Sequence, residues 1–291
     1  MHSLKIILRH MRLKLALYSM LAFFFALLVE RIPLSISVCI GAASFLFLNI
    51  GANLFNDYYD RDHGPLIGLE APTKVTKAII RGAWTMKILG LILALALFNR
   101  LFVLLYILGI AVSYVYSHKS VRAKSNPFLS ILFGIGSGSA IFFAGALLGD
   151  MIIDSKLVLG MLSSGLFLSS FHILTQIYET REDKKRHDNT IAIIYGKRFA
   201  VMLSLSFFII TGIINIYLFY LMNFNIYIIS YSAFYFIAVT YLMAKWMQKE
   251  PESDSKDYHI VKYFVPYLVL IVYLTIFILY VYYVSGYFIT F

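Results

Sequence analysis

Long apolar stretches separated by short polar segments run along the whole sequence. Most of them reach the length of about 20 residues that an α-helix needs to cross the hydrocarbon core of a bilayer. The pattern predicts nine membrane-spanning helices, at residues 14–30, 34–56, 86–99, 101–117, 128–149, 155–178, 199–221, 225–246 and 262–289. The sequence therefore predicts an all-α polytopic membrane protein that forms a single domain over residues 1–291.

Composition agrees with this assignment. Hydrophobic residues make up 60% of the chain and charged residues only 14%, whereas a soluble domain carries about 25% charged residues. The net charge of +10 does not indicate nucleic-acid binding, because the basic residues are dispersed over short segments between the predicted spans. We therefore expect the bilayer, and no nucleic acid, as the environment of this chain.

The distribution of Lys and Arg predicts the orientation. If the N-terminus is cytoplasmic, 22 of the 25 Lys and Arg residues face the cytoplasm, and only Arg31, Arg100 and Lys156 face outward. The positive-inside rule then places the N-terminus in the cytoplasm and the C-terminus outside. We expect a multi-pass protein of a prokaryotic plasma membrane, whose long cytoplasmic loops at 57–85, 118–127 and 179–198 carry the function.

The first 13 residues predict a short basic helix on the membrane surface. His2, Lys5, Arg9 and Arg12 form one stripe of this helix, with apolar residues opposite. Such a helix lies in the interface, with its basic face toward anionic lipid headgroups. We interpret this segment as an anchor without a role in chemistry.

Two acidic clusters end the second and the sixth predicted spans. The first contains Asn53, Asn56, Asp57, Asp60 and Asp62, and the second contains Gln176, Glu179, Glu182, Asp183 and Asp188. Within each cluster, spacings of three or four residues place the side chains on one helical face. Because both spans run from outside to inside, the clusters lie at the same membrane depth. Two carboxylates this close repel one another unless a cation lies between them.

The residue types favour magnesium and a diphosphate. Hard oxygen ligands from two facing helices suit Mg²⁺, which takes one or two carboxylates and completes its shell with water and phosphate oxygens. Basic residues near both clusters would bind the phosphate groups. The predicted metal ligands are Asn56, Asp57, Asp60, Glu179 and Asp183, and the predicted diphosphate ligands are Asn53, Asn56, Lys77, Arg81, Arg122, Lys124 and Lys184.

These residues resemble the motifs of the UbiA superfamily of intramembrane prenyltransferases. That family has nine transmembrane helices and two Asp-rich motifs, after the second and the sixth helices. The NDYYD run at 56–60 is similar to the first motif, and most of all to its menaquinone-type branch, which prenylates dihydroxynaphthoate. The run from Glu179 to Asp183 resembles the second motif, and YSHKSVRAK at 116–124 resembles a further family segment. The chain departs from the first motif at Gly64, where an Asp is usual, and Asp62 is the candidate replacement.

The resemblance implies an activity. A prenyl diphosphate donor would lose its diphosphate with Mg²⁺ as cofactor, and a lipophilic aromatic acceptor, a quinone precursor, would take the prenyl group. Asp57, Asp60, Asp183, Lys77 and Arg122 are the residues that this reading makes catalytic.

Three alternatives remain open at this point. A UbiA-type membrane terpene cyclase would act on the same donor without an acceptor, and a lipid hydroxyl could replace the aromatic ring in a transferase. An ion-coupled or divalent-cation transporter is the alternative from another class, although transporters usually place charged residues near the bilayer midplane.

Overall fold

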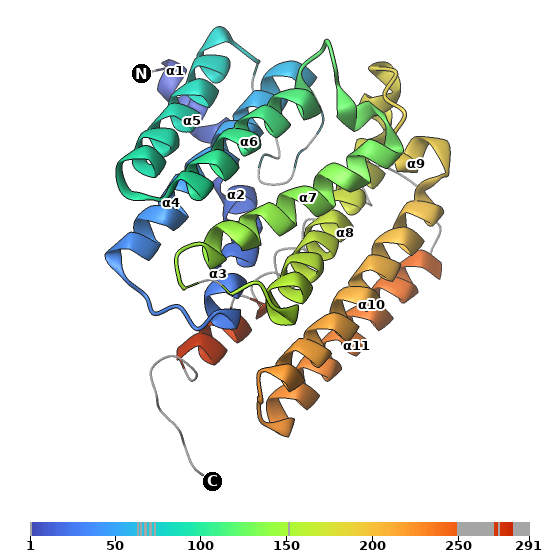
Figure 1. The fold of residues 1–291 in the computed structure, drawn as a ribbon. Helices are drawn as coiled ribbons and strands as arrows, with labels where there is room; N and C mark the ends of the chain where they lie inside the picture. Colours follow the sequence, from blue (N-terminus) through green and yellow to red (C-terminus); the bar gives the residue numbers. More distant parts are fainter. Residues whose placement is uncertain are drawn as a thin grey trace.

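The computed structural model describes residues 2–62, 64, 66, 69, 72, 74–150, 152–248, 271–272 and 274–281. Over these residues the chain is helical, apart from loops and one isolated bridge between Leu66 and Leu69 (Figure 1). The helices are α1 His2–His10, α2 Leu13–Ser19, α3 Leu21–Val29, α4 Ile36–Asp60, α5 Lys77–Leu97, α6 Arg100–Ser117, the 3₁₀ helix η1 Ala123–Ser125, α7 Pro127–Ala146, α8 Ser155–Lys185, α9 Ile191–Ile194, α10 Lys197–Leu221 and α11 Ile226–Gln248.

Eight segments of the described residues are long and apolar enough to cross a membrane. The first of them, Leu4–Val29, is divided among α1, α2 and α3, and the other seven are single helices. They correspond to the first eight predicted spans. Of the ninth, 262–289, residues 271–272 and 274–281 are helical and the rest lies outside the described residues. The count of nine spans therefore stays a prediction.

The helices extend further into the polar segments than the hydrophobic pattern predicted. α4 continues through the first acidic cluster to Asp60, and α8 continues through the second to Lys185. α5 already begins at Lys77, so the loops 57–85 and 179–198 are shorter than expected. The hydrophobic pattern missed the last turns of α4 and α8 because their buried carboxylates pair with cations, which lets these two helices extend beyond their apolar parts.

Lys87 is one of the 22 residues predicted to face the cytoplasm, and it lies within the candidate span Lys77–Leu97. Its side chain is fully buried within α5, where Nζ donates a hydrogen bond of 2.7 Å to Ser113 Oγ. The ammonium also lies 4.1 Å from the ring centroid of Phe55. These two contacts compensate part of the cost of burying a charge.

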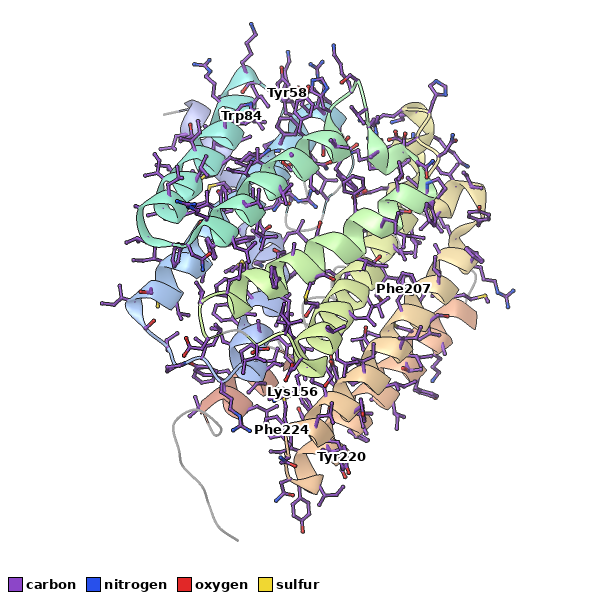
Figure 2. The ribbon with its side chains drawn as sticks, viewed as in Figure 1. Tyr58, Trp84, Lys156, Phe207, Tyr220 and Phe224 are labelled. Carbon is purple, nitrogen blue, oxygen red and sulfur yellow. The ribbon has the colours of Figure 1, made fainter. Side chains whose placement is uncertain are left out.

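Close helix packing forms the bundle. α4 packs along α5, and α8 packs between α7 and α10. A glycine makes the α7–α8 contact possible, since a Cβ at Gly138 would lie 2.4 Å from the carbonyl oxygen of Ser164. Tyr58 and Trp84 lie at one end of the bundle, whereas Lys156 lies at the opposite end (Figure 2). The two acidic helix ends belong to the same end as Tyr58.

The N-terminal segment differs from its prediction. α1 ends at His10, and Arg12 adopts a left-handed backbone conformation with φ 47° at the break before α2. Arg12 therefore does not continue the stripe of His2, Lys5 and Arg9, and only 7% of it is exposed. The reading of this segment as an anchor without chemistry does not hold for its last residues, which reach the first acidic cluster.

Candidate functional site

The last turn of α4 holds two buried carboxylates. Asp57 and Asp60 are 3% and 9% exposed, and the helix ends where Arg61 turns into the left-handed conformation. Asn56 lies one turn before Asp60 and donates a hydrogen bond of 2.8 Å from Nδ2 to Asp60 Oδ2. Buried carboxylates are stable only with compensating charge or hydrogen bonds.

The N-terminal segment compensates Asp57. His10 Nδ1 lies 2.9 Å from Asp57 Oδ2, and Arg12 Nη1 donates to Asp57 Oδ1 at 3.1 Å. The partners stand 47 and 45 residues away along the chain, so helical periodicity could not predict the pairing. His10 and Arg12 are therefore site residues that the sequence reasoning missed.

The loop between α6 and α7 compensates Asp60. Arg122 has a left-handed backbone with φ 45°, and its Nη2 donates to Asp60 Oδ1 at 3.0 Å. Lys124, on η1, contacts the other oxygen of Asp60 and donates a bond of 2.8 Å to Asn56 Oδ1. Ser117 Oγ donates to the same Asn56 oxygen at 2.9 Å. The placement of Arg122 and Lys124 beside the first cluster agrees with the sequence prediction.

Arg186 joins the two acidic clusters. Its guanidinium contacts Asp62, donates to Asp183 Oδ1 at 2.5 Å and donates to Asp188 Oδ2 at 3.0 Å. Asp188 also accepts bonds of 2.6 and 2.7 Å from Arg122. Arg186 and Asp188 were absent from the predicted ligands, although the run of charges after α8 could have suggested them.

The charges of this network shift the pKa values of its loop residues. Burial and the neighbouring Asp60 raise the pKa of Asp62, and Arg186 and Lys124 only partly oppose the rise. Burial also tends to raise the pKa of Asp188, but its hydrogen bonds with Arg122 and Arg186 outweigh it and hold this pKa below the ordinary value. The same carboxylates overcome the effect of burial on Arg122 and Arg186 and raise both of their pKa values. The network therefore shifts the pKa values of Asp62 and Asp188 in opposite directions, upward for Asp62 and downward for Asp188.

The other predicted ligands divide into two groups. Glu179 interacts electrostatically with Arg12, Asp62 and Asp183 and so belongs to the network. Asn53 lies one turn before Asp57, and its Nδ2 is buried without a hydrogen-bond partner among the described residues. By contrast, three predicted basic ligands are exposed and form no ion pair within the described part of the chain: Lys77, Arg81 and Lys184. The structure therefore does not bring these three into the cluster.

Comparison with known proteins identifies the family. The sequence profile of the UbiA prenyltransferase family matches residues 16–265. The chain belongs to the UbiA prenyltransferase family. This membership confirms the resemblance drawn from the sequence and makes the chain an integral membrane protein of the prenyltransferase class.

Two curated relatives have names that indicate different reactions. The chain is 27% identical over 173 residues to a 1,4-dihydroxy-2-naphthoate octaprenyltransferase of Bacillus subtilis, and the alignment covers 55% of each protein. The chain thus matches about half the length of that relative. It is 26% identical over 235 residues to a digeranylgeranylglyceryl phosphate synthase of Methanosphaera stadtmanae, which covers 78% of this chain and 82% of the relative.

Solved structures of UbiA homologues share the fold. A homologue from Archaeoglobus fulgidus, bound to DMAPP and Mg²⁺, superimposes with a TM-score of 0.69 at 19% identity and covers 96% of this chain and 99% of the homologue. The structure of a digeranylgeranylglyceryl phosphate synthase superimposes with a TM-score of 0.67 at 22% identity, covering 97% and 99%. At these identities the likeness establishes the arrangement of the helices.

The donor set of this UbiA chain fits a divalent cation by charge. Counted by formal charge, with every carboxyl group ionised and His10 neutral, six carboxylates of the network face four cations, an excess of two negative charges that a divalent metal ion would balance. The carboxylates are Asp57, Asp60, Asp62, Glu179, Asp183 and Asp188, and the cations are Arg12, Arg122, Lys124 and Arg186. Within the described residues, no three His, Cys, Asp or Glu side chains are grouped closely enough to hold an ion without rearrangement.

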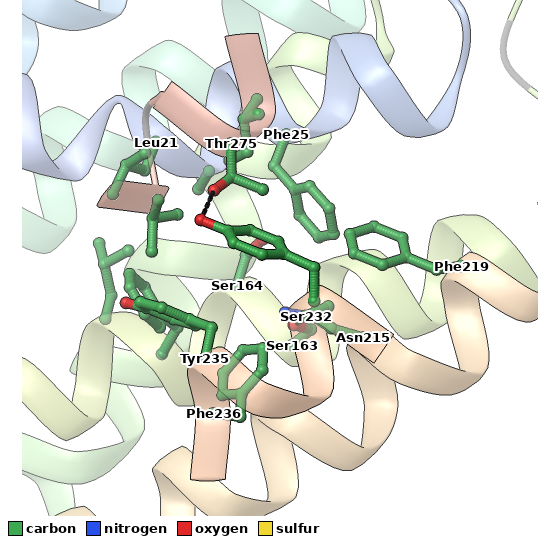
Figure 3. Close-up of a pocket in the computed structure, with 16 residues that line it drawn as sticks. Leu21, Phe25, Ser163, Ser164, Asn215, Phe219, Ser232, Tyr235, Phe236 and Thr275 are labelled. Atoms are coloured by element: carbon green, nitrogen blue, oxygen red, sulfur yellow. Dashed lines mark hydrogen bonds between the residues drawn. The ribbon is translucent and has the colours of Figure 1, made fainter. Parts of the chain in front are cut away.

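The described residues also form an apolar cavity of about 70 Å³ (Figure 3). Its walls come from α3, α8, α10, α11 and the helical residues near 275, and include Phe25, Phe167 and Phe219. Ser164 also lines it, about 28 Å from Asp183 along α8 at 1.5 Å per residue. These walls suit hydrocarbon and not a phosphate group, so the cavity is separate from the charged site.

Proposed function

We propose that this chain catalyses the Mg²⁺-dependent transfer of a prenyl group from a prenyl diphosphate to a lipophilic aromatic acceptor, a quinone precursor, within the membrane. The observation that carries the proposal is the meeting of two carboxylate-bearing helix ends, α4 and α8, at one end of an apolar bundle. Family membership supports the transferase class, and the Mg²⁺ and DMAPP bound to the Archaeoglobus homologue support the cofactor and the donor.

The charge balance explains why the donor would need a metal. A diphosphate carries several negative charges, and by formal charge the network already has two more negative than positive charges. Without a metal ion, the network and the diphosphate would therefore repel one another. Mg²⁺ held by Asn56, Asp57, Asp60, Glu179 and Asp183 would supply the positive charge that stabilises the leaving diphosphate. This prediction of the ligand set rests on donor chemistry.

The basic residues of the network supply the second part of the site. Arg122 and Lys124 come from one loop and both contact Asp60, so they are held at the first motif. As the allylic C–O bond breaks, negative charge grows on the diphosphate, and prepositioned cations stabilise this transition state more than the bound donor. The unpartnered Nδ2 of Asn53 is a further donor for an anionic oxygen.

A glyceryl phosphate lipid is the second candidate acceptor. The Methanosphaera synthase aligns over 78% of this chain, against 55% for the Bacillus naphthoate enzyme. Both candidates would use the same donor half of the site, so they differ only in the nucleophile.

The test separates these possibilities. Purified protein in detergent is incubated with Mg²⁺ and geranylgeranyl diphosphate, alone or with dihydroxynaphthoate, hydroxybenzoate or geranylgeranylglyceryl phosphate. Released diphosphate and lipid products are measured together, the latter by mass spectrometry. Aromatic-dependent release supports the proposal, and release that requires the glyceryl phosphate transfers it to the second candidate. Acceptor-independent formation of a hydrocarbon or alcohol would indicate a cyclase and overturn transfer.

Two matched variants on α8 serve as controls. Asp183→Asn removes a carboxylate of the network, and we expect activity to fall at least about 100-fold. Asp154→Asn makes the same change at the opposite end of the helix, where the side chain caps the N-terminus by accepting from Lys156 N and Leu157 N. Asn caps helices as well as Asp does, so activity should be retained.

A further inference from the structure

A tyrosine and a histidine form a contact just beneath the acidic clusters. Tyr116 Oη lies 2.5 Å from His172 Nε2, and Ser130 Oγ lies 3.2 Å from the same nitrogen. The three residues come from α6, α8 and α7, so three helices converge on one imidazole. The proposed function assigns no role to this group.

Neighbouring residues hold the imidazole in place. Gln176, one turn further along α8, donates from Nε2 to Ser130 Oγ at 3.0 Å. Its Oε1 accepts a hydrogen bond of 3.1 Å from the backbone N–H of Ile191. Both Gln176 and Ser130 are buried. An imidazole that is fixed by a chain of hydrogen bonds keeps one orientation, as proton-transfer groups require.

The pair is close to the proposed donor site. Lys124 Nζ, which contacts Asp60, lies 6.0 Å from the ring centroid of Tyr116. The next residue along α6, Ser117, donates to Asn56. His172 precedes Glu179 by two helical turns, about 10 Å along α8. A molecule bound against the donor's allylic carbon on the apolar side would therefore lie beside Tyr116.

The two side chains differ from their neighbours in exposure. Tyr116 and His172 are half-buried, whereas Ser130 and Gln176 are buried. The ring of Phe133, 5.8 Å from that of Tyr116, supplies an aromatic wall beside it.

We propose that Tyr116 and His172 act as the proton acceptor for the nucleophile, an inference that rests on the proposed function. The proton of the acceptor's hydroxyl group passes to Tyr116 Oη while the tyrosine's own proton passes to His172 Nε2. The electron pair of the nucleophile forms the bond to the allylic carbon, and the electron pair of the broken C–O bond leaves with the diphosphate. Attack by a ring carbon leaves the acceptor as a ketone, and the hydrogen at the attacked carbon then moves as a proton to the carbonyl oxygen and restores the hydroxyl group. One hydrogen of the ring is thereby replaced by the prenyl group, and the original hydroxyl proton resides on the imidazole.

The charged groups around the pair come from all the neighbouring elements. Lys124 on η1 interacts electrostatically with His172, and Asp60, Glu179 and Asp183 interact with Tyr116. These charges act on the two side chains differently: Lys124 disfavours an imidazolium at His172, and the three carboxylates favour the neutral phenol of Tyr116.

The experiment compares His172→Gln and Tyr116→Phe with the wild-type protein. Transfer to dihydroxynaphthoate or hydroxybenzoate is measured as a function of pH, beside acceptor-independent release of diphosphate. We expect transfer to fall by about 10²–10⁴-fold near neutral pH in both variants, which is the usual contribution of general-base catalysis. Release of diphosphate without an acceptor should stay within about threefold of wild type, because it does not need the proton transfer through Tyr116 to His172, which we call the relay.

The pH profile distinguishes chemistry from structure. Without the relay, hydroxide must remove the proton, so log kcat of His172→Gln should rise by about one unit per pH unit where the wild type is flat. His118→Gln is the matched control: this imidazole stacks on Tyr114 and bonds Ser120, and we expect its profile to equal that of the wild type.

The outcomes are separable from those of the proposed function. If the wild type transfers the prenyl group and His172→Gln transfers it equally well, or if its deficit is the same at every pH, the relay is overturned and the proposed function stands. If the wild type releases diphosphate but forms no product with any acceptor, both fail together. A pH-dependent deficit in His172→Gln and Tyr116→Phe, absent in His118→Gln, supports the relay.

Discussion

Arg186 is the residue whose removal tests the charge network most directly. Its single guanidinium contacts Asp62, Asp183 and Asp188, which are 9%, 4% and 3% exposed. Substitution by Gln keeps much of the side-chain volume and some hydrogen-bonding capacity but removes the charge. The three carboxylates then lose this partner without any change in the apolar packing of the helices.

The three carboxylates differ in how many hydrogen bonds they keep when Arg186 is replaced. Asp188 keeps two bonds from Arg122, and Asp183 keeps a contact of 3.3 Å from Thr190 Oγ1. For Asp62, Arg186 is the one salt-bridge partner that the described residues show. Leaving a buried charge without its partner costs about 3–5 kcal/mol, and the remaining bonds reduce this cost. We therefore expect Arg186→Gln to lower the free energy of unfolding by roughly 2–4 kcal/mol at pH 8.

The free energy of unfolding that Arg186→Gln removes should become smaller as the pH falls. The pKa of Asp62 is already raised by burial and by Asp60, and removing Arg186, which lowers it, raises it further. A carboxyl group whose folded pKa lies above its unfolded value of about 3.9 stabilises the fold fully below that value and loses this contribution as the pH rises through the folded pKa. Each unit of the additional rise is worth about 1.4 kcal/mol. At pH 5 we thus expect less than half of the loss seen at pH 8.

The assay is reversible unfolding of the detergent-solubilised protein by sodium dodecyl sulfate. Carried out at pH 5 and at pH 8, it measures the loss of stability in Arg186→Gln at each pH. Lys185→Gln is the matched control, because Lys185 is exposed and pairs with Glu182 on the surface at 2.7 Å. Such a pair contributes at most about 1 kcal/mol. An equal loss for Arg186→Gln at the two pH values, or a loss no larger than that of Lys185→Gln, would refute the reasoning.

Three further predictions follow from the same contacts. Mg²⁺ at about 100 times its Kd should stabilise the protein by about 2.7 kcal/mol in thermal unfolding; this gain should vanish in Asp60→Asn and persist in Asp154→Asn, and its survival in Asp60→Asn would remove Asp60 from the metal site. Gly138→Ala should lower the free energy of unfolding by about 1–3 kcal/mol, because its Cβ would meet the Ser164 backbone at 2.4 Å. Gly136→Ala is the control: a Cβ at this position would have no atom of the described residues within 4 Å, so the substitution should be neutral or stabilising by up to about 1 kcal/mol. Equal effects of the two substitutions would contradict this packing. Arg12→Gln should abolish most transferase activity because it removes the cationic partner of Asp57 and leaves only His10 beside this carboxylate. Arg9→Gln, at an exposed position of α1, should weaken membrane attachment by only about 1 kcal/mol. Equal activities of the two variants would return Arg12 to the role of an anchor.

The hydrophobic pattern was sufficient for the helices themselves. Eight of the predicted spans match described helices because a run of about 20 apolar residues has few stable alternatives in a bilayer, where every backbone hydrogen bond must be made within the segment. The spacing of Asn56, Asp57 and Asp60 likewise implied one helical face, since the periodicity of an α-helix is a local property. The facing of the two acidic helix ends also followed from counting spans.

The choice of cationic partners was decided by the tertiary structure. Lys77 and Lys184 stand near the acids along the chain, yet their side chains are exposed, whereas Arg12 and Arg186 reach Asp57 and Asp62 from 45 and 124 residues away. Ion pairing depends on the direction in which a loop turns, and here left-handed residues such as Arg122 set that direction. Such turns leave no periodic signal in a single sequence. The composition of the site could therefore be read from the chain, but the pairing of its charges only from the fold.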